Sequence, residues 1–209
     1  MARAARDALR LDTVLFAPVG AQPLKPLGST ASFEDRVAMT ALAIQGERGF
    51  VVSEIDAPDA AGEPNYTMET LRRLRAGLPD VALFCLMGAD SFLTLRKWRR
   101  AEEIPLAAAL IVASRPGQQL DDLTAALPKG LELQPSVGKS LDPAIELQVY
   151  RLRNRRGVES AFYVLPDLDV EISASEIRAR VREPEGESHA AELVPEAVER
   201  FIREHGLYR

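Results

Sequence analysis

Short runs of continuously apolar residues alternate with segments of helical composition, and this pattern limits the fold more than any other feature. The clearest runs are residues 13–17, 81–87 and 108–114. A strand that is apolar at every position is typical of a parallel sheet with helices on both faces. The alternation therefore predicts a doubly wound α/β fold with a mostly parallel sheet, whose ligands lie beyond the carboxyl ends of the strands.

Propensity, spacing and capping signals predict the remaining elements. Helices are expected at residues 2–10, 33–45, 67–76, 91–98, 120–127, 173–181 and 195–205, with further strands at 50–55 and 161–165. Residues 131–157 carry no clear pattern. Ser32 followed by Asp35 is typical of a helix N-cap, whereas Pro195 is expected at the first helical position and Gly206 at the C-cap. Length and the lack of internal repeats favour a single domain, 1–209, with a helical C-terminal part at about 172–209.

Composition excludes several classes of function. The 26 basic and 31 acidic residues give a net charge of −5, which argues against a strong electrostatic nucleic-acid binder. Cys85 is the only cysteine, and His189 and His205 are the only histidines, which argues against a zinc site and against Ser-His-Asp catalysis. No apolar stretch is long enough to span a membrane, and no signal-peptide pattern is present. We expect a cytoplasmic protein without a membrane partner.

The end of the most apolar run carries one candidate binding feature. Gly88, Ala89 and Asp90 follow this run directly. A glycine allows a ligand to approach the backbone closely, and a carboxylate at this place can accept ribose hydroxyl hydrogen bonds. Asp90 is equally well explained as the N-cap of the next helix. Both explanations remain open.

A second candidate lies near the C-terminus. Ser173 and Glu176 have the spacing of a capping box, which would stabilise the following helix. The same helix start, with Ser175 nearby and Arg178 one turn further on, has the composition of an anion-binding site. The residues alone favour the cap slightly over the phosphate site.

Three more features have both a structural and a functional explanation. Trp98 either packs its helix onto the core or stacks on a planar ring. In Asn65-Tyr66-Thr67, either Asn65 or Thr67 is expected to cap a helix. Lys25 lies between two prolines beyond a strand end, where it is either solvated or in contact with a phosphate.

The order of these features resembles one known family. Along the chain follow Pro23-Leu24-Lys25, Tyr66-Thr67, Gly88-Ala89-Asp90-Ser91, Trp98, Arg115-Pro116-Gly117 and Ile172-Ser173-Ala174-Ser175-Glu176-Ile177-Arg178. In this order and at these spacings they resemble the bacterial nicotinate-nucleotide adenylyltransferases of the nucleotidyltransferase superfamily. The resemblance covers nearly the whole chain. It implies a Rossmann-like nucleotidyltransferase fold.

The resemblance also implies a reaction and a set of roles. ATP and nicotinate mononucleotide would give deamido-NAD and pyrophosphate, with Mg²⁺ accompanying ATP, by direct in-line attack and without a covalent intermediate. Catalysis would then rest on positioning and on stabilisation of charge. The expected catalytic residues are Lys25, Ser175 and Arg178; the expected nucleotide-binding residues are Gly88, Asp90, Arg115 and Ser173; the expected pyridine pocket is Tyr66, Thr67 and Trp98.

The chain departs from the family pattern at its start. The family begins with a strand and a GGxFDPxHxGH loop, and this chain has neither; it also has Leu24 where the family often has a histidine. About 20 residues are expected to be missing, the size of one strand, its loop and a helical turn. Either the chain begins at an internal Met, which we favour, or it is a degenerate homologue. We expect this chain to be poorly stable and nearly inactive, and a longer version to release more pyrophosphate.

Two other functions stay open on the sequence. A sister enzyme would act on pantetheine phosphate or nicotinamide mononucleotide, although Trp98 and Tyr66-Thr67 favour a planar pyridine ring. A catalytically impaired homologue would bind nucleotide without turnover. The main hypothesis requires Arg178 and Trp98 to face one shared cleft. The sequence predicts no oligomeric state.

Overall fold

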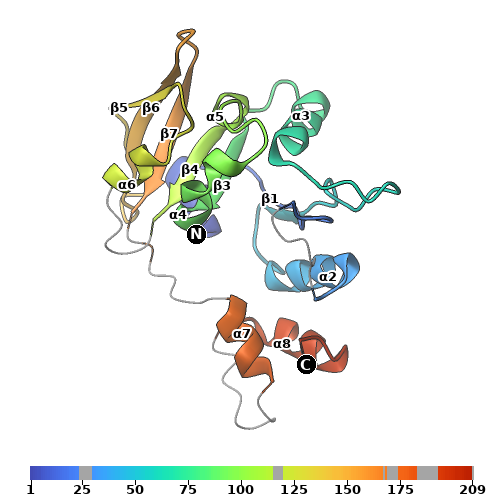
Figure 1. Ribbon diagram of the computed structural model, residues 1–209. Coiled ribbons are helices and arrows are strands. Elements are labelled where there is room, and N and C mark those ends of the chain that lie inside the picture. The colour runs from blue at the N-terminus through green and yellow to red at the C-terminus, as the bar shows by residue number, and fades with distance from the viewer. Residues whose placement is uncertain (24–29, 115–119, 167, 169–173, 183–192, 209) are drawn as a thin grey trace. The chain divides into compact units, whose positions relative to one another are not determined.

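The computed structural model describes residues 1–23, 30–114, 120–166, 168, 174–182 and 193–208, and Figure 1 shows their helices and strands. The chain divides into two compact units. Unit 1 comprises Met1–Asp12 and Tyr66–Val170, and unit 2 comprises Thr13–Asn65 and Glu171–Arg209. Each unit is described by itself.

Unit 1 is built on a five-stranded sheet with the order β3-β4-β7-β6-β5. The strands are β3 (Phe84–Gly88), β4 (Ala109–Ala113), β5 (Leu131–Pro135), β6 (Gln148–Asn154) and β7 (Glu159–Leu165). Strands β3, β4 and β7 are parallel, whereas β6 and β5 continue the sheet in antiparallel pairing. The expected mostly parallel α/β architecture is confirmed. The unpatterned stretch 131–157 proves to contain the two antiparallel strands.

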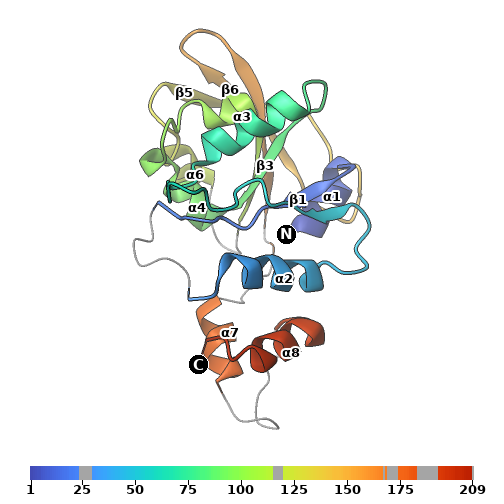
Figure 2. The same cartoon turned by 90° about the vertical axis from the view of Figure 1, so that its right-hand side faces the viewer.

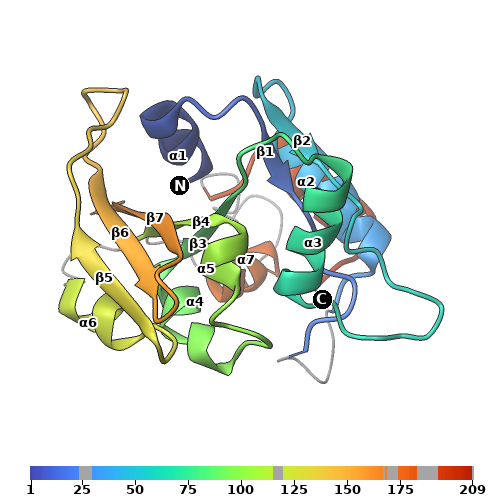
Figure 3. The same ribbon diagram turned by 90° about the horizontal axis from the view of Figure 1, so that it is seen from above.

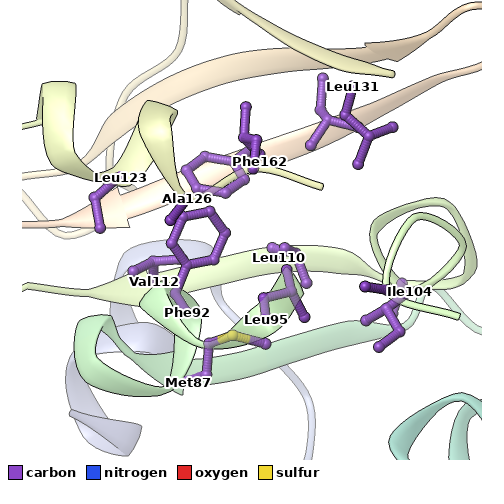
Figure 4. Close-up of a cluster of buried hydrophobic side chains, with 14 of the residues drawn as sticks. Met87, Phe92, Leu95, Ile104, Leu110, Val112, Leu123, Ala126, Leu131 and Phe162 are labelled. Carbon is purple, nitrogen blue, oxygen red and sulfur yellow. The ribbon is translucent and has the colours of Figure 1, made fainter. Parts of the chain in front are cut away.

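Helices cover both faces of this sheet. On one face lie α3 (Thr67–Gly77), α4 (Ala89–Leu93), α5 (Ile104–Ala107) and α6 (Leu120–Ala125). Their core centres on the fully buried rings of Phe92 and Phe162, which meet edge to face at 5.4 Å (Figure 4). The opposite face carries α1 (Ala2–Leu9) alone among the described helices of unit 1 (Figure 3).

Alternation along the strands explains this layering. Ile111 points toward α1 and packs with its residue Ala5, whereas Leu110 and Val112 point into the core of the other face. Successive side chains of a strand point to opposite faces, so an apolar run supplies both layers at once. Because β3, β4 and β7 are parallel, their carboxyl ends lie at the same end of the sheet, and ligands of such folds bind beyond that end.

Unit 2 combines a small sheet with three helices. Strands β1 (Val14–Phe16) and β2 (Phe50–Val52) form a parallel pair. The helices are α2 (Phe33–Ala43), α7 (Ala174–Val181) and α8 (Glu196–Glu204), shown in blue and orange-red in Figure 2. Their core contains Val181, Val198 and Ile202. The backbone N–H of Asp35 donates to the Ser32 hydroxyl at 3.0 Å, which confirms the predicted N-cap.

Three details differ from the sequence expectations. The helix expected to reach Trp98 stops at Leu93, because the Thr94 hydroxyl donates to the Ser91 carbonyl and such local bonds compete with helix continuation. Pro195 is the N-cap of α8 and not its first residue, since its ψ of 140° is extended. The C-cap of α8 is His205, and Gly206 follows it with a φ of 61°.

Within the described ranges, β3 pairs only with β4 and β1 pairs only with β2. The parallel strands thus form two separate sheets, although the sequence pattern predicts one. Among the described residues, β3 has a partner strand on one side only, and so do both β1 and β2. The row of unpaired backbone groups along β3 lies on an apolar strand, which is unusual for a sheet edge.

Candidate active site

The carboxyl end of β3 leads directly into α4 and positions two predicted residues. Gly88 ends the strand and is the N-cap of α4, without a side-chain capping bond. Asp90 lies exposed in the first helical turn, so the alternative that Asp90 is the N-cap is wrong. A methyl group added at Gly88 would meet no atom closer than Met1 Cε at 3.8 Å. Packing within the described protein therefore does not require a glycine here.

Trp98 follows α4 at the end of a short 3₁₀ helix, Leu95–Lys97. Its indole Nε1–H donates to the Thr94 hydroxyl at 3.3 Å, and the half-buried ring packs against the core of unit 1. Trp98 itself has extended backbone angles. The packing explanation of Trp98 is thus confirmed, while the partly exposed ring keeps a surface on which a planar ligand can stack.

Tyr66 and Thr67 mark the start of α3. Thr67 is the first helical residue and Tyr66 the N-cap, without a side-chain capping bond. The expectation that Asn65 or Thr67 caps this helix is therefore wrong. The Asn65 side-chain oxygen instead accepts from the backbone N–H of Ala21 at 2.8 Å, and the backbone N–H of Asn65 donates to the Ala21 carbonyl. The Asn65 side-chain amide is thus bonded to Ala21, 44 residues earlier, and does not cap the helix.

One contact brings the two aromatic segments together. The guanidinium of Arg99, directly after Trp98, lies over the Tyr66 ring at 4.7 Å from its centre. This distance is that of a cation–π contact. The predicted pyridine-pocket residues Tyr66, Thr67 and Trp98 therefore lie on two neighbouring segments of unit 1.

Ion pairs fix these segments to one another. Arg100 donates from Nε to Glu103 at 2.6 Å, and its guanidinium also reaches Glu69 of α3 at 4.0 Å. Arg72 of α3 pairs with Glu69 at 3.3 Å and with Glu103 at 4.0 Å. The hydrogen bond from Arg100 lowers the pKa of the Glu103 carboxyl below its usual value. The network keeps the turn after Trp98 beside the start of α3.

The predicted phosphate-binding residues belong to segments of which less is described. Lys25, Arg115 and Ser173 lie outside the described residues, and of Ser175 only the backbone position, in the first turn of α7, is described. Arg178 lies in α7 and lines a cavity of about 480 Å³. Arg178 belongs to unit 2 and Trp98 to unit 1. Their shared cleft stays a prediction.

The cavity beside Arg178 contains residues that the sequence analysis did not single out. Arg182 lies one turn after Arg178 and donates from Nε to the Tyr208 carbonyl at 2.6 Å. Burial raises the pKa of the Tyr208 phenol, while the Arg178 and Arg36 guanidinium groups act in the opposite direction. The i, i+4 spacing of Arg178 and Arg182 places both on one face of a helix, and this is the sequence pattern that could have indicated the cavity. Arginine is so abundant in this chain that the spacing alone is not distinctive.

Arg36 is a further residue whose role the pattern did not predict. Its guanidinium donates to the carbonyls of Val19 and Gly20, and so holds the start of the loop that leads to Lys25. Gly20 is required at its place, because a methyl group there would lie 2.6 Å from the Pro58 nitrogen. Arg36 Nε is buried and has no hydrogen-bond partner among the described atoms.

Comparisons with known proteins identify the family. A family model described as cytidylyltransferase-like matches residues 1–180. A curated protein of Citrifermentans bemidjiense, named "Probable nicotinate-nucleotide adenylyltransferase", is 37% identical over 209 residues, which is 100% of this chain and 89% of that protein. The chain belongs to the bacterial nicotinate-nucleotide adenylyltransferase family. A protein of the same name from Geobacter sulfurreducens is 35% identical over 210 residues, with the same coverage.

Solved structures agree on the adenylyltransferase fold. The nicotinic acid mononucleotide adenylyltransferase of Plasmodium falciparum complexed with APC has a TM-score of 0.65 at 13% identity, over 98% of this chain and 87% of that one. The same enzyme complexed with NaAD gives a TM-score of 0.64 at 14% identity, with the same coverage. At such identities the likeness concerns the fold, and it confirms the Rossmann-like nucleotidyltransferase architecture.

Two features are absent from the described residues of this adenylyltransferase. No helix there has the length and apolar character needed to cross a lipid bilayer. No group of three or more His, Cys, Asp or Glu side chains there is arranged to hold a metal ion.

Proposed function

We propose that the chain transfers the adenylyl group of ATP to nicotinate mononucleotide, giving deamido-NAD and pyrophosphate. The observation that carries this proposal is the 37% identity over the whole chain to a curated nicotinate-nucleotide adenylyltransferase. The two aromatic side chains Tyr66 and Trp98, which lie on neighbouring segments of unit 1, support it because a pyridine ring needs flat apolar surfaces. A cytoplasmic location remains a prediction of the sequence.

The proposed chemistry is one in-line displacement at phosphorus. An oxygen of the mononucleotide phosphate attacks the α-phosphorus of ATP and forms the new phosphoanhydride bond. The bond from the α-phosphorus to the oxygen that bridges to the β-phosphate breaks, and its electron pair leaves with pyrophosphate. No enzyme nucleophile takes part. Burial raises the pKa of the Cys85 thiol to about 11, which keeps this sole cysteine inert.

Binding and positioning would then fall to two groups of residues. The proposed phosphate group is Lys25, Arg115, Ser173, Ser175 and Arg178, of which Arg178 lines the cavity in unit 2. It would hold the triphosphate and stabilise the charge that develops on the departing pyrophosphate. The proposed nucleoside group is Gly88 and Asp90 at the end of β3, where Asp90 would accept hydrogen bonds from a ribose.

Mg²⁺ is proposed to arrive as part of the substrate. Proteins commonly bind this ion through one or two carboxylates together with substrate phosphates, without a cage of their own ligands. The ion would neutralise phosphate charge, while Arg178 and Ser175 hold the triphosphate in line.

Pyrophosphate release with ATP and different acceptors tests the proposal. Nicotinate mononucleotide should give the fastest release, nicotinamide mononucleotide a slower one, and pantetheine phosphate no more than the acceptor-free control. A preference for pantetheine phosphate would assign the chain to the sister activity. Binding of ATP without any acceptor-dependent release would support the alternative of an impaired nucleotide-binding homologue.

A further inference from the structure

The position of the Arg99 side chain is unusual for its surroundings. Arg99 is exposed, and its guanidinium lies 4.7 Å from the centre of the Tyr66 ring. No carboxylate within the part of the chain that the structure describes pairs with it. The Tyr66 ring face holds the guanidinium in place, and this contact uses none of the five N–H donors of Arg99.

The neighbouring cations are already engaged. Arg100 is hydrogen-bonded to Glu103, Arg72 pairs with Glu69, and Arg96 donates to the Leu127 carbonyl at 2.8 Å. Arg99 therefore differs from the arginines around it in keeping its donors for a ligand. Its guanidinium contacts Tyr66, and Arg99 directly follows Trp98 in the chain, so it adjoins both aromatic residues of the proposed pyridine pocket.

We propose that Arg99 binds the carboxylate of the nicotinate ring and thereby selects nicotinate mononucleotide over nicotinamide mononucleotide. This inference rests on the proposed function. A carboxylate accepts two parallel N–H bonds from a guanidinium, and a neutral amide offers only one acceptor oxygen.

The charge of the ring strengthens the discrimination. The ring nitrogen of both mononucleotides is quaternary and positive, so each ring stacks favourably on Trp98 or Tyr66. In the nicotinate compound the carboxylate offsets that charge next to Arg99. In the nicotinamide compound nothing offsets it, and the guanidinium repels the ring. Arg99 would thus attract one substrate and disfavour the other, which gives more selectivity than attraction alone.

Steady-state kinetics of two Arg99 variants test the proposal. Arg99→Gln should raise KM for nicotinate mononucleotide about tenfold or more, the loss expected for one charge-assisted pair, and leave KM for ATP and kcat unchanged. KM for nicotinamide mononucleotide should stay the same or fall, so that the selectivity collapses. Arg99→Lys should recover part of it. Lys97→Gln, which removes an exposed cation two residues earlier, is the matched control and should change neither KM.

Intrinsic fluorescence provides a readout that does not depend on turnover. Trp98 is the only tryptophan of the chain, so quenching on titration with either mononucleotide reports on this pocket directly. The Arg99→Gln substitution should weaken quenching by nicotinate mononucleotide alone. Equal weakening for both compounds, or no change for either, would overturn the proposal. A wild-type chain without adenylyl transfer would refute the proposed function, whereas the titration would still decide the role of Arg99.

Discussion

Two valines show how differently the two parallel sheets are built. Val112 of β4 is fully buried between β3 and β7, whereas Val51 of β2 is 46% exposed. Both lie in apolar parallel strands, so local sequence does not separate them. The five-stranded sheet of unit 1 has helices on both faces, and the side chains of its strand β4 are covered on both.

The comparison shows where the stability of each unit resides. Two strands alone are marginal in water, and a second strand residue of unit 2, Leu15, is also 39% exposed. Unit 2 instead builds its core from helices, with Val181, Val198 and Ile202 at its centre. Unit 1 thus carries Tyr66 and Trp98 beside a sheet with helices on both faces, and unit 2 holds the Arg178 side chain on a helical assembly.

The largest effect is expected from Arg178 of unit 2. Arg178→Gln should lower kcat/KM for ATP by about 10²–10³, as loss of one donor to developing charge does. Arg180→Gln is the control on the same helix, because Arg180 pairs with Glu176 at 2.8 Å. Equal losses in both variants would show that Arg178 acts only through the helix and not on a phosphate.

The second prediction uses the two valines directly. Val112→Thr should lower the free energy of unfolding by about 1–3 kcal/mol, since it buries a hydroxyl group without a partner. Val51→Thr should change it by no more than about 0.5 kcal/mol, as is usual for an exposed side chain. Urea denaturation of both variants measures the difference. Similar losses at the two positions would mean that β2 is covered to the same extent as β4.

The sequence predicts the element order well and the partners of the elements poorly. Apolar runs and caps such as Ser32 depend on neighbours within a few residues, which the sequence contains directly. The break at Thr94 and the use of the Asn65 amide by Ala21 depend on three-dimensional competition for hydrogen bonds. Arg99 on the Tyr66 ring joins residues 33 positions apart in the sequence, a pairing that no local pattern encodes.

The candidate site likewise has one part that the sequence predicts and one part that it does not. Residue types typical of anion binding or ring stacking, such as Arg178 and Trp98, are recognisable in the sequence. The supporting contacts around the site are not: Arg36 donates to the backbone carbonyls of Val19 and Gly20, and the Tyr208 carbonyl accepts from Arg182. Such supporting contacts involve main-chain atoms, which every residue has, so they leave no signature.

Gly88→Ala is the third prediction, and it separates packing from ligand approach in unit 1. A methyl group at Gly88 meets nothing closer than 3.8 Å, so the free energy of unfolding should change by no more than about 0.5 kcal/mol. If a nucleotide approaches this backbone closely, KM for ATP should rise about tenfold, equivalent to about 1.4 kcal/mol. An active variant with an unchanged KM would remove Gly88 from the binding site.

The smallest effect concerns the ion pairs beside the aromatic pocket. The hydrogen bond from Arg100 lowers the pKa of Glu103 in the folded chain. The stability that the Arg100–Glu103 pair contributes is therefore complete above the pKa of a free glutamate. It is lost as the pH falls through the pKa that Glu103 has in the folded chain. Glu103→Gln should lower the thermal midpoint slightly at pH 7 and by progressively less as the pH falls below the pKa of a free glutamate, because exposed pairs contribute little and protonation removes this one. An equal difference at every pH would contradict this origin.

Across the described ranges, no strand pairs with β3 on the side opposite β4, and this bears on how the protein behaves in concentrated solution. The residues of β3, Phe84–Gly88, carry no charge, and the strand contains neither lysine nor proline, which natural sheet edges use to prevent pairing with other chains. Short uncharged strands with free edges are templates for sheet growth between molecules. Solubility therefore depends on this strand, because a β3 edge that is open to solvent is a starting point for aggregation.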